Sequence, residues 1–263
     1  AEVVPVGIVG DDESGEGLLN YFQEKKVSTR HVLCRRRHIT PTKSRILGGL
    51  SHWQRQQIVR IDREPPQPLE PAMRRRLSET AAHLLLNASA LLVSDYGYGT
   101  TTAQEIDTLR RRVGGVRVPI TVDSRFDLLS YSRITAATPN EPEVEEAFAR
   151  KIGTNLPVLH ELGRKLLRRM SLEALVITRG RDGMVLFEPR RAPRHIAVFG
   201  SDQAVDVTGA GDTVIAAFTL ALASGANPFQ AAQLANCAGG LVVMKRGTAT
   251  VSAQELREAI RNT

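Results

Sequence analysis

The chain has 263 residues, of which 42% are hydrophobic, and a formal net charge of +7 at pH 7. This length suits one α/β domain, with or without a small appendage. The sequence contains no run of 18 apolar residues and only two cysteines, and its start does not resemble a signal peptide, so we expect no membrane span and no disulfide framework. We therefore expect a cytoplasmic protein with no membrane contact.

The basic residues occur in short arginine runs at 35–37, 74–76, 110–112 and 168–169. A basic patch can indicate nucleic-acid binding. Here the runs fall in separate predicted elements, and aromatic residues, which stack on bases, make up only 5% of the chain. We expect solvated helix faces, a general attraction for phosphorylated small molecules and no nucleic-acid partner.

Short apolar stretches alternate with helical patterns along the chain. The predicted strands cover 4–10, 44–47, 57–62, 91–95, 119–123, 134–137, 175–178, 184–187 and 196–199. The predicted helices cover 14–26, 72–87, 102–112, a segment from about 143, 157–170 and three segments at the end of the chain. This alternation predicts an α/β fold with a mainly parallel sheet flanked by helices on both faces.

Polar or glycine-rich loops follow several of these strands. They read SDYGYG, DSR, TPNEPE, TRGRDG and DVTGAGDT, and begin at residues 94, 123, 138, 178 and 206. In parallel sheets, ligands bind outside the carboxyl ends of the strands. The five loops therefore predict a ligand site at one edge of the sheet.

The stretch DVTGAGDT combines an anion-binding turn with a carboxylate. Gly209 and Gly211 permit close approach to the backbone, and the apolar segment 213–225 predicts a buried helix. A glycine turn at a helix start favours phosphate. Asp212, beside it, has two interpretations: an N-cap of the helix, or a general base that takes a proton from a hydroxyl during phosphoryl transfer.

Two further motifs have structural and functional interpretations. Asn140 and Glu143 are predicted either to cap a helix or, through Glu143, to hold Mg²⁺ directly or through water. Thr178, Gly180 and Gly183 form TxGxxG, typical of a tight hairpin and also of backbone that borders a nucleotide. The loop GDDESG at 10–15 lacks the lysine of a GxxxxGK[ST] nucleotide loop, so we expect a turn with acidic helix-start residues.

Together, DVTGAGDT, NEPE at 140–143 and TRGRDG resemble signatures of the ribokinase-like, or PfkB-type, carbohydrate kinases, and the similarity extends over essentially the whole chain. Within that family, the chain is most similar to the kinases that phosphorylate D-glycero-D-manno-heptose 7-phosphate at its anomeric hydroxyl, for ADP-heptose and lipopolysaccharide synthesis. The stretches that carry this similarity are SDYGYG, TPNEPE, DVTGAGDTVIAAF, ANCAGGLVVMKRGTATVS and QQIVRIDRE.

The resemblance implies a single ribokinase-like kinase domain over 1–263, with 41–64 as the strands of a small β lid. It implies ATP and Mg²⁺ as cofactors, a monovalent cation near Asp206, a sugar phosphate as the other substrate, and a homodimer formed through the lid strands. The resemblance implies that Asp212 is the base and that the N–H groups of Gly209, Ala210 and Gly211 lie at the transferring phosphoryl group. It places Asn140 and Glu143 at the phosphates and Mg²⁺, and Arg60 and Asp62 at the sugar. The nucleotide pocket would contain Thr178, Gly180, Gly183 and Asn236.

The chain also departs from the family pattern. Relatives have a further N-terminal segment with part of the sugar site, and this sequence starts after it, at what resembles the following segment, GIVGDDESG. Tyr98 stands where relatives often have lysine, Ser124 and Arg125 replace a proline and a lysine, and Val207 replaces a threonine or serine. Two alternatives therefore stay open: a non-catalytic nucleotide-binding relative, and a ribokinase-like kinase for another sugar.

Overall fold

The computed structural model describes residues 1–263 apart from 49–55, 67, 115–117, 201–203 and 263. The chain divides into two compact units. The smaller comprises residues Ala1–His83 and Tyr98–Thr102, and the larger comprises Leu84–Gly97 and Ala103–Thr263. Two compact units can belong to one domain, so the predicted single kinase domain over 1–263 stays a prediction.

The smaller unit contains two small sheets. Its elements are β1 (Gly7–Gly10), α1 (Glu13–Glu24), β2 (Val32–Arg35), β3 (Thr42–Gly48), β4 (Gln56–Arg63) and most of α2 (Pro71–Leu85). Strand β1 pairs with β2 in parallel, and β3 pairs with β4 antiparallel. Strand β2 was not predicted from the sequence, because VLCR is too short to show a clear alternation of apolar and polar residues.

The loop GDDESG forms the predicted turn at the start of a helix. Asp12 caps α1 by accepting from the backbone N–H of Gly15 at 2.8 Å, and Glu13 and Glu16 lie in the first turn. Asp12 also accepts from the hydroxyl and the N–H of Thr40, at 2.6 and 2.9 Å. The hydrogen bonds from Thr40 lower the pKa of Asp12. The interpretation of this loop as a structural turn is confirmed.

The predicted lid strands form a two-stranded ribbon, β3 and β4, which pairs from Thr42 with Arg63 to Gly48 with Gln56. The GGLSHWQR stretch between the two predicted strands lies mostly outside the described residues. The ribbon exposes apolar side chains, namely Ile46, Ile58, Val59 and Ile61. Its role as a lid stays a prediction.

The larger unit is built on a six-stranded sheet in the order β10-β9-β8-β7-β6-β5. Strands β5 to β8 run parallel, whereas β9 and β10 are antiparallel to their neighbours, so the predicted mainly parallel sheet is confirmed. The elements are β5 (Leu91–Asp95), α3 (Ala103–Arg112), β6 (Ile120–Ser124), η1 (Leu128–Ser130), β7 (Ala136–Ala137), α4 (Glu141–Phe148), α5 (Leu156–Arg169), β8 (Ala174–Thr178), η2 (Gly180–Asp182), β9 (Met184–Phe187), β10 (Arg194–Ile196), α6 (Ala210–Ala223), α7 (Pro228–Val242) and α8 (Ala253–Arg261).

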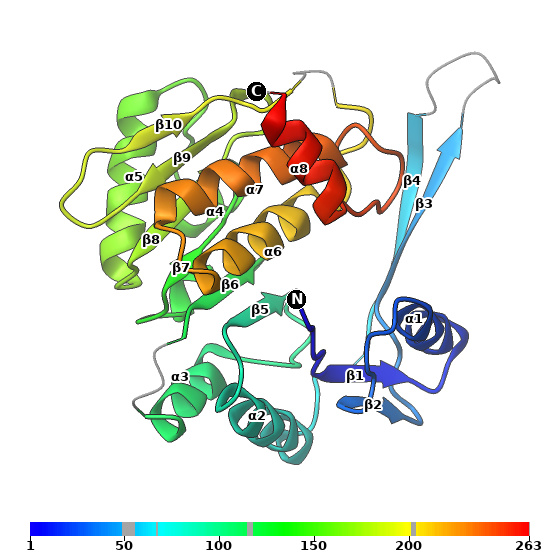
Figure 1. Cartoon of the computed structure of the whole chain (residues 1–263). Coiled ribbons are helices and arrows are strands. Elements are labelled where there is room, and N and C mark those ends of the chain that lie inside the picture. Colours follow the sequence, from blue (N-terminus) through cyan, green and yellow to red (C-terminus); the bar gives the residue numbers. More distant parts are fainter. Residues whose placement is uncertain (49–55, 67, 115–117, 201–203, 263) are drawn as a thin grey trace. The chain divides into compact units, whose positions relative to one another are not determined.

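Two apolar clusters form the core of this unit. One joins the sheet to α3, α4 and α5, through residues such as Ile106, Val144 and Leu162. The other joins it to α6 and α7, which lie side by side over the sheet in Figure 1. Helix α6 buries Val214, Ile215 and Phe218, among other residues, as its nearly all-apolar sequence predicts.

Some boundaries differ from those predicted. Strand β7 begins at Ala136, two residues after the predicted start at Ile134, and ends at Ala137 as predicted. Helix α4 begins at Glu141, two residues before the predicted start, since Pro142 is tolerated in a first helical turn. The turn predicted within TRGRDG is the 3₁₀ helix η2.

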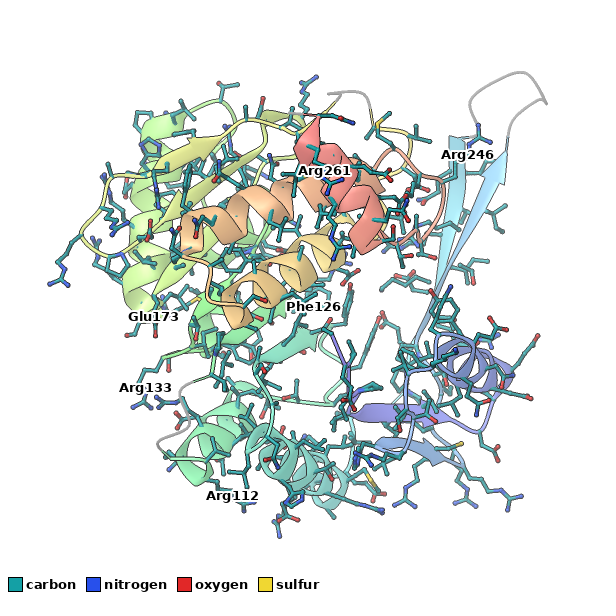
Figure 2. The ribbon with its side chains drawn as sticks, viewed as in Figure 1. Arg112, Phe126, Arg133, Glu173, Arg246 and Arg261 are labelled. Atoms are coloured by element: carbon teal, nitrogen blue, oxygen red, sulfur yellow. The ribbon has the colours of Figure 1, made fainter. Side chains whose placement is uncertain are left out.

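The basic side chains of the larger unit come from separate elements. Figure 2 labels Arg112 at the end of α3, Arg133 before β7, Arg246 after α7 and Arg261 at the end of α8. Asp107 on α3 pairs with Arg110 and Arg133, each at 3.0 Å, so part of this charge is neutralised locally. Among the described residues, no helix has the length and apolarity needed to cross a bilayer.

Candidate active site

One hollow of the larger unit lies where β5, β6, β7 and β8 end and α6 begins. Its volume is about 160 Å³, and its lining residues are Asp95, Tyr96, Asp123, Arg125, Thr138, Asn140, Glu143, Thr178, Gly211 and Asp212. Each of the five predicted loops contributes at least one of them. Drug-sized ligands occupy roughly 300–1,000 Å³, so the hollow suits a phosphate-sized group rather than a whole nucleotide.

The N-terminus of α6 opens into this hollow. Gly209 is the N-cap, with a left-handed φ of 79°, and no side chain in the described residues caps the helix. A side-chain carbon built at Gly209 or at Gly211 would meet no atom within 4 Å, so the space beside this turn is free. Free space at the positive end of a long buried helix is an arrangement that favours an anion.

Asp212 is the third residue of α6 and does not cap it, so of its two interpretations the N-cap is wrong. Its Oδ1 accepts a hydrogen bond from the phenol of Tyr96 at 2.9 Å. Burial raises the pKa of Tyr96, and the charge of Asp212 raises it further, so the phenol remains a donor at neutral pH. Asp212 is an exposed residue of the lining, so its carboxylate is accessible to a ligand in the hollow.

The N-terminus of α4 also faces the hollow, and it is closed by side chains. Asn140 Oδ1 accepts from the N–H of Glu143, and Glu143 Oε2 accepts from the N–H of Asn140, each at 2.9 Å. This reciprocal capping box confirms the structural interpretation of the NEPE motif. Burial raises the pKa of Glu143. Its position in the lining is compatible with a second, functional role.

Carboxylates gather between these two helix ends. Burial first, and then the negative charges of Glu143, Asp212 and Asp95, together raise the pKa of Asp123 to about 7. The hydroxyl of Thr138 is buried without a hydrogen-bond partner among the described residues. Carboxylate and hydroxyl oxygens are ligands that suit Mg²⁺, directly or through water. In the part of the chain that the structure describes, no three histidine, cysteine or carboxylate side chains are grouped to hold a metal ion, so the donors available to Mg²⁺ are two carboxylates and this hydroxyl.

Asp95 has a structural role at the same edge of the sheet. It is buried, and it accepts from the N–H of Gly97 at 2.9 Å, the hydroxyl of Ser124 at 3.0 Å and the phenol of Tyr131 at 2.8 Å. Both oxygens of its carboxylate therefore accept from protein donors. These bonds hold the loop that carries Tyr96.

Comparison with known proteins identifies the family. The model of the pfkB family carbohydrate kinases matches residues 1–255. The chain belongs to the pfkB family of carbohydrate kinases. This membership confirms the predicted class, a phosphotransferase that acts on an alcohol group.

Curated relatives in this family include the bifunctional protein HldE of Pelobacter propionicus, which is 35% identical over 261 residues, 99% of this chain and 52% of the relative. The bifunctional protein HldE of Mesorhizobium japonicum is 37% identical over 264 residues, 99% of this chain and 51% of the relative. The chain thus spans about half the length of the curated relatives it matches.

Similarity to solved structures confirms the ribokinase-like fold. Ribokinase of Arabidopsis thaliana, complexed with ribose and ATP, superposes with a TM-score of 0.75 at 18% identity, over 97% of this chain and 81% of that one. Phosphofructokinase-2 of Escherichia coli, in complex with potassium, superposes with a TM-score of 0.73 at 16% identity, over 97% of this chain and 80% of that one.

The structure of this pfkB-family chain brings five of the twelve predicted site residues together. Those that line the hollow are Asp212, Gly211, Asn140, Glu143 and Thr178. Gly209 and Ala210 lie next to it at the start of α6, where the N–H of Ala210 donates to the carbonyl of Val207 at 3.2 Å. The predicted contact of Ala210 with a phosphoryl group would have to replace that bond.

The other predicted residues do not line the hollow. A side-chain carbon at Gly183 would lie 2.1 Å from the carbonyl oxygen of Ile196, so this glycine permits a close approach of two backbone segments. Asn236 donates to the carbonyl of Ala197 at 2.7 Å. Arg60 and Asp62 belong to the smaller unit and pair with each other at 2.8 Å. The roles predicted for these residues, and for Gly180, stay predictions.

Five lining residues were not predicted as site residues, namely Asp95, Tyr96, Asp123, Arg125 and Thr138. The loops that contain them were identified from the sequence. What the sequence did not reveal is which side chains in those loops point inward. A stricter application of the rule for carboxyl ends of strands would have selected Asp95 and Asp123, the polar residues at the ends of β5 and β6.

Proposed function

We propose that the chain transfers the γ-phosphoryl group of ATP to the anomeric hydroxyl of D-glycero-D-manno-heptose 7-phosphate. The observation that carries this proposal is Asp212, a carboxylate at the open N-terminus of α6 inside the hollow. Membership of the carbohydrate-kinase family supports the reaction class. The choice of acceptor is supported by three stretches that resemble those of the heptose phosphate kinases. These stretches are SDYGYG, TPNEPE and residues 235–252.

In the proposed reaction, Asp212 accepts the proton of the acceptor hydroxyl. The hydroxyl oxygen forms a bond to the γ-phosphorus, the bond from that phosphorus to the bridging oxygen breaks, and ADP leaves with that oxygen. The N-terminus of α6 stabilises the negative charge on the phosphoryl oxygens through its unpaired N–H groups and its dipole. Tyr96 holds one oxygen of Asp212, so that the other oxygen faces the acceptor.

Asp123, Glu143 and Thr138 would hold Mg²⁺, directly or through water. When bound, the ion neutralises phosphate charge and fixes the phosphates in place. It would also relieve the mutual repulsion that raises the pKa of Asp123. A monovalent cation near Asp206 is part of the proposal, and potassium is present in the phosphofructokinase-2 structure.

Homodimerisation through β3 and β4 is also proposed. The support is the exposed apolar row of Ile46, Ile58, Val59 and Ile61 on the ribbon, which is unusual on a surface that faces only water. Gel filtration with multi-angle light scattering tests it. Replacement of Ile58 and Ile61 by serine is expected to convert a dimer to a monomer, and a wild-type monomer would contradict the proposal.

The reaction is tested with purified chain, Mg²⁺-ATP and a panel of sugar phosphates that includes the heptose 7-phosphate, with products followed by phosphorus NMR. We expect turnover with the heptose compound, and a loss of about 10²- to 10⁴-fold in Asp212→Asn, since removal of a general base has effects of this size. Asp11→Asn, which changes an exposed carboxylate of the smaller unit, is the matched control and should retain full activity.

Three outcomes would count against the proposal in different ways. Turnover with another sugar phosphate alone would correct the acceptor and keep the kinase. ATP binding by calorimetry without turnover of any acceptor would favour the non-catalytic relative. Full activity in Asp212→Asn would remove the proposed base.

A further inference from the structure

An ion pair joins two of the motifs proposed to bind the nucleotide. Arg179, which follows Thr178 in the TRGRDG loop, donates from Nε to Oε1 of Glu141 in the NEPE motif at 2.6 Å. The side chains are only 9% and 20% exposed, so this pair is largely withdrawn from water. Neither residue lines the hollow, and neither was predicted to have a function.

The backbone places this pair at the joint between the two motifs. The N–H of Thr178 donates to the carbonyl of Pro139 at 2.9 Å, and Asn140 forms a parallel bridge with Thr178. The N–H of Arg179 donates to the carbonyl of Gly183 at 2.8 Å and closes the loop on itself. The side-chain pair thus adds a second connection, beyond the backbone, between the TRGRDG loop and the start of α4.

The surroundings of the guanidinium restrict it to this partner. Its second contact, with Asp182 of the same loop, is longer, at 3.7 Å, and Asp182 is exposed. Another neighbour of the guanidinium is His160 of α5. Burial lowers the pKa of His160, and the positive charges of His195, Arg164 and Arg179 lower it further. Among these groups, Glu141 is the one close, shielded carboxylate, and charge-assisted hydrogen bonds of this kind are strong and directional.

A shielded ion pair is a poor source of folding stability, because desolvation offsets most of the attraction, whereas it can fix geometry. We propose that Arg179 is a positioning residue, which holds the TRGRDG loop at a fixed separation from the NEPE motif so that one ATP molecule contacts both. The inference rests on the proposed function, in which the loop borders the nucleoside and the start of α4 organises the phosphates. A fixed separation lowers the cost of ordering the site when ATP binds.

The inference is tested by the dependence of affinity on ligand length. Dissociation constants for ATP and for adenosine are measured by calorimetry, with adenosine measured by displacement. In Arg179→Met we expect the affinity for ATP to fall about tenfold, because ATP spans both motifs, and the affinity for adenosine to change less than about twofold. Arg150→Met, which changes an exposed arginine of the same unit that pairs with Glu161 and lies outside the hollow, is the matched control and should leave both affinities unchanged.

A double variant separates positioning from folding. Arg179→Met with Glu141→Gln removes both charges together, so no buried charge is left without a partner and thermal stability should return toward the wild type. The affinity for ATP should stay about tenfold low. Recovery of affinity together with stability would overturn the inference, as would an equal loss for ATP and adenosine, or a wild-type chain that binds neither.

These results are independent of phosphoryl transfer. A chain that binds ATP without acting on any sugar phosphate would contradict the proposed function and still give the ratio of the two affinities. An unchanged ratio in an active enzyme would overturn the role of Arg179 alone.

Discussion

The two helices that begin at the hollow, α4 and α6, differ in how their N-termini are capped. Helix α4 is closed by a capping box, in which Asn140 and Glu143 satisfy each other's backbone N–H groups. Helix α6 begins at Ala210, after the N-cap Gly209, and has no side-chain cap in the described residues. Unpaired N–H groups at a helix start attract an anion. The capped N-terminus of α4 therefore has a structural role, whereas the uncapped N-terminus of α6 is suited to bind an anion.

The difference has an energetic origin in how each helix is held. Helix α4 has eight residues and buries only Val144, so side-chain capping contributes a large share of its stability. Helix α6 has fourteen residues and is held by packing along its length, including a 2.6 Å hydrogen bond between Thr219 and Thr121 of β6. Because packing already stabilises α6, its N-terminus can remain open.

Glu143→Gln gives the sharpest test of this contrast. Glutamine also completes a capping box, so the helix start should survive, whereas the charge available to Mg²⁺ is lost. We expect the turnover rate to fall about 100-fold and the Mg²⁺ concentration for half-maximal rate to rise about tenfold, consistent with loss of one charged metal contact. The melting temperature should change by less than about 2 °C.

Glu146→Gln, on the exposed side of the same helix, is the control for this variant and should leave all three quantities unchanged. A large drop in melting temperature for Glu143→Gln, with the Mg²⁺ dependence unaltered, would mean that Glu143 is a capping residue only. The N-terminus of α4 would then have a structural role only, and of the two helices only α6 would take part in function.

Asp123→Asn tests the carboxylates that lie between the two helix ends. The pKa of Asp123 is about 7 in the folded chain and 3.8 as the ordinary value, so between these pH values the folded state holds a proton that the unfolded state releases. The contribution of Asp123 to stability is therefore fully present below pH 3.8 and is lost as pH rises through about 7. Asparagine removes this loss.

We expect Asp123→Asn to gain about 4 kcal/mol in free energy of unfolding, relative to the wild type, between pH 4 and pH 8 without Mg²⁺, because the pKa differs by about 3 between the folded and unfolded states and each pKa unit corresponds to about 1.4 kcal/mol. Urea unfolding of both proteins across this range, with EDTA present, measures the difference. Added Mg²⁺ should stabilise the wild type at pH 8 more than the variant. A difference that does not change with pH would show that Asp123 is not protonated in this range.

The sequence predicted the elements and motifs of this site better than its contacts. Strands β5 and β9 have the predicted bounds, and four of the five loops meet at one edge because the parallel strands β5 to β8 end together. Those features follow from local apolar patterning and one topological rule. Whether Asp212 caps α6 could not be decided from the sequence, because the sequence around a helix start does not show which residue is the N-cap.

Contacts between distant residues could not be predicted. Tyr96 and Asp212 are 116 residues apart, and Arg179 and Glu141 are 38 apart. Whether such side chains meet depends on strand order and on the direction of each side chain, neither of which is encoded in local periodicity. The raised pKa of Asp123 likewise depends on three charges from three other segments.

Tyr96→Phe tests the hydroxyl that contacts the open helix end. Phenylalanine keeps the ring and removes only the donor to Asp212, so the carboxylate loses one of the bonds that orient it. We expect the turnover rate to fall about tenfold, with KM for ATP changed less than about twofold, because orientation acts on the transfer step. Steady-state kinetics at saturating acceptor measure both.

Tyr98→Phe is the control two residues along, since the phenol of Tyr98 donates to Glu64 in the smaller unit at 3.1 Å. It should leave the turnover rate unchanged. Equal losses in the two variants would mean that the loop, rather than the bond to Asp212, controls the rate. A turnover rate that rises in Tyr96→Phe would mean that the phenol blocks the base.

Asn140→Ala, the smallest expected effect, asks whether the closed helix end is purely structural. Loss of the N-cap should lower the free energy of unfolding by about 1 kcal/mol. Ser252→Ala removes the N-cap of the same kind of capping box on α8, which contributes no residue to the hollow. Urea unfolding should therefore give similar losses for both variants. If Asn140 also orients Glu143 toward the phosphates, ATP affinity measured by calorimetry should fall only in Asn140→Ala, and equal affinity in the two variants would confine Asn140 to capping.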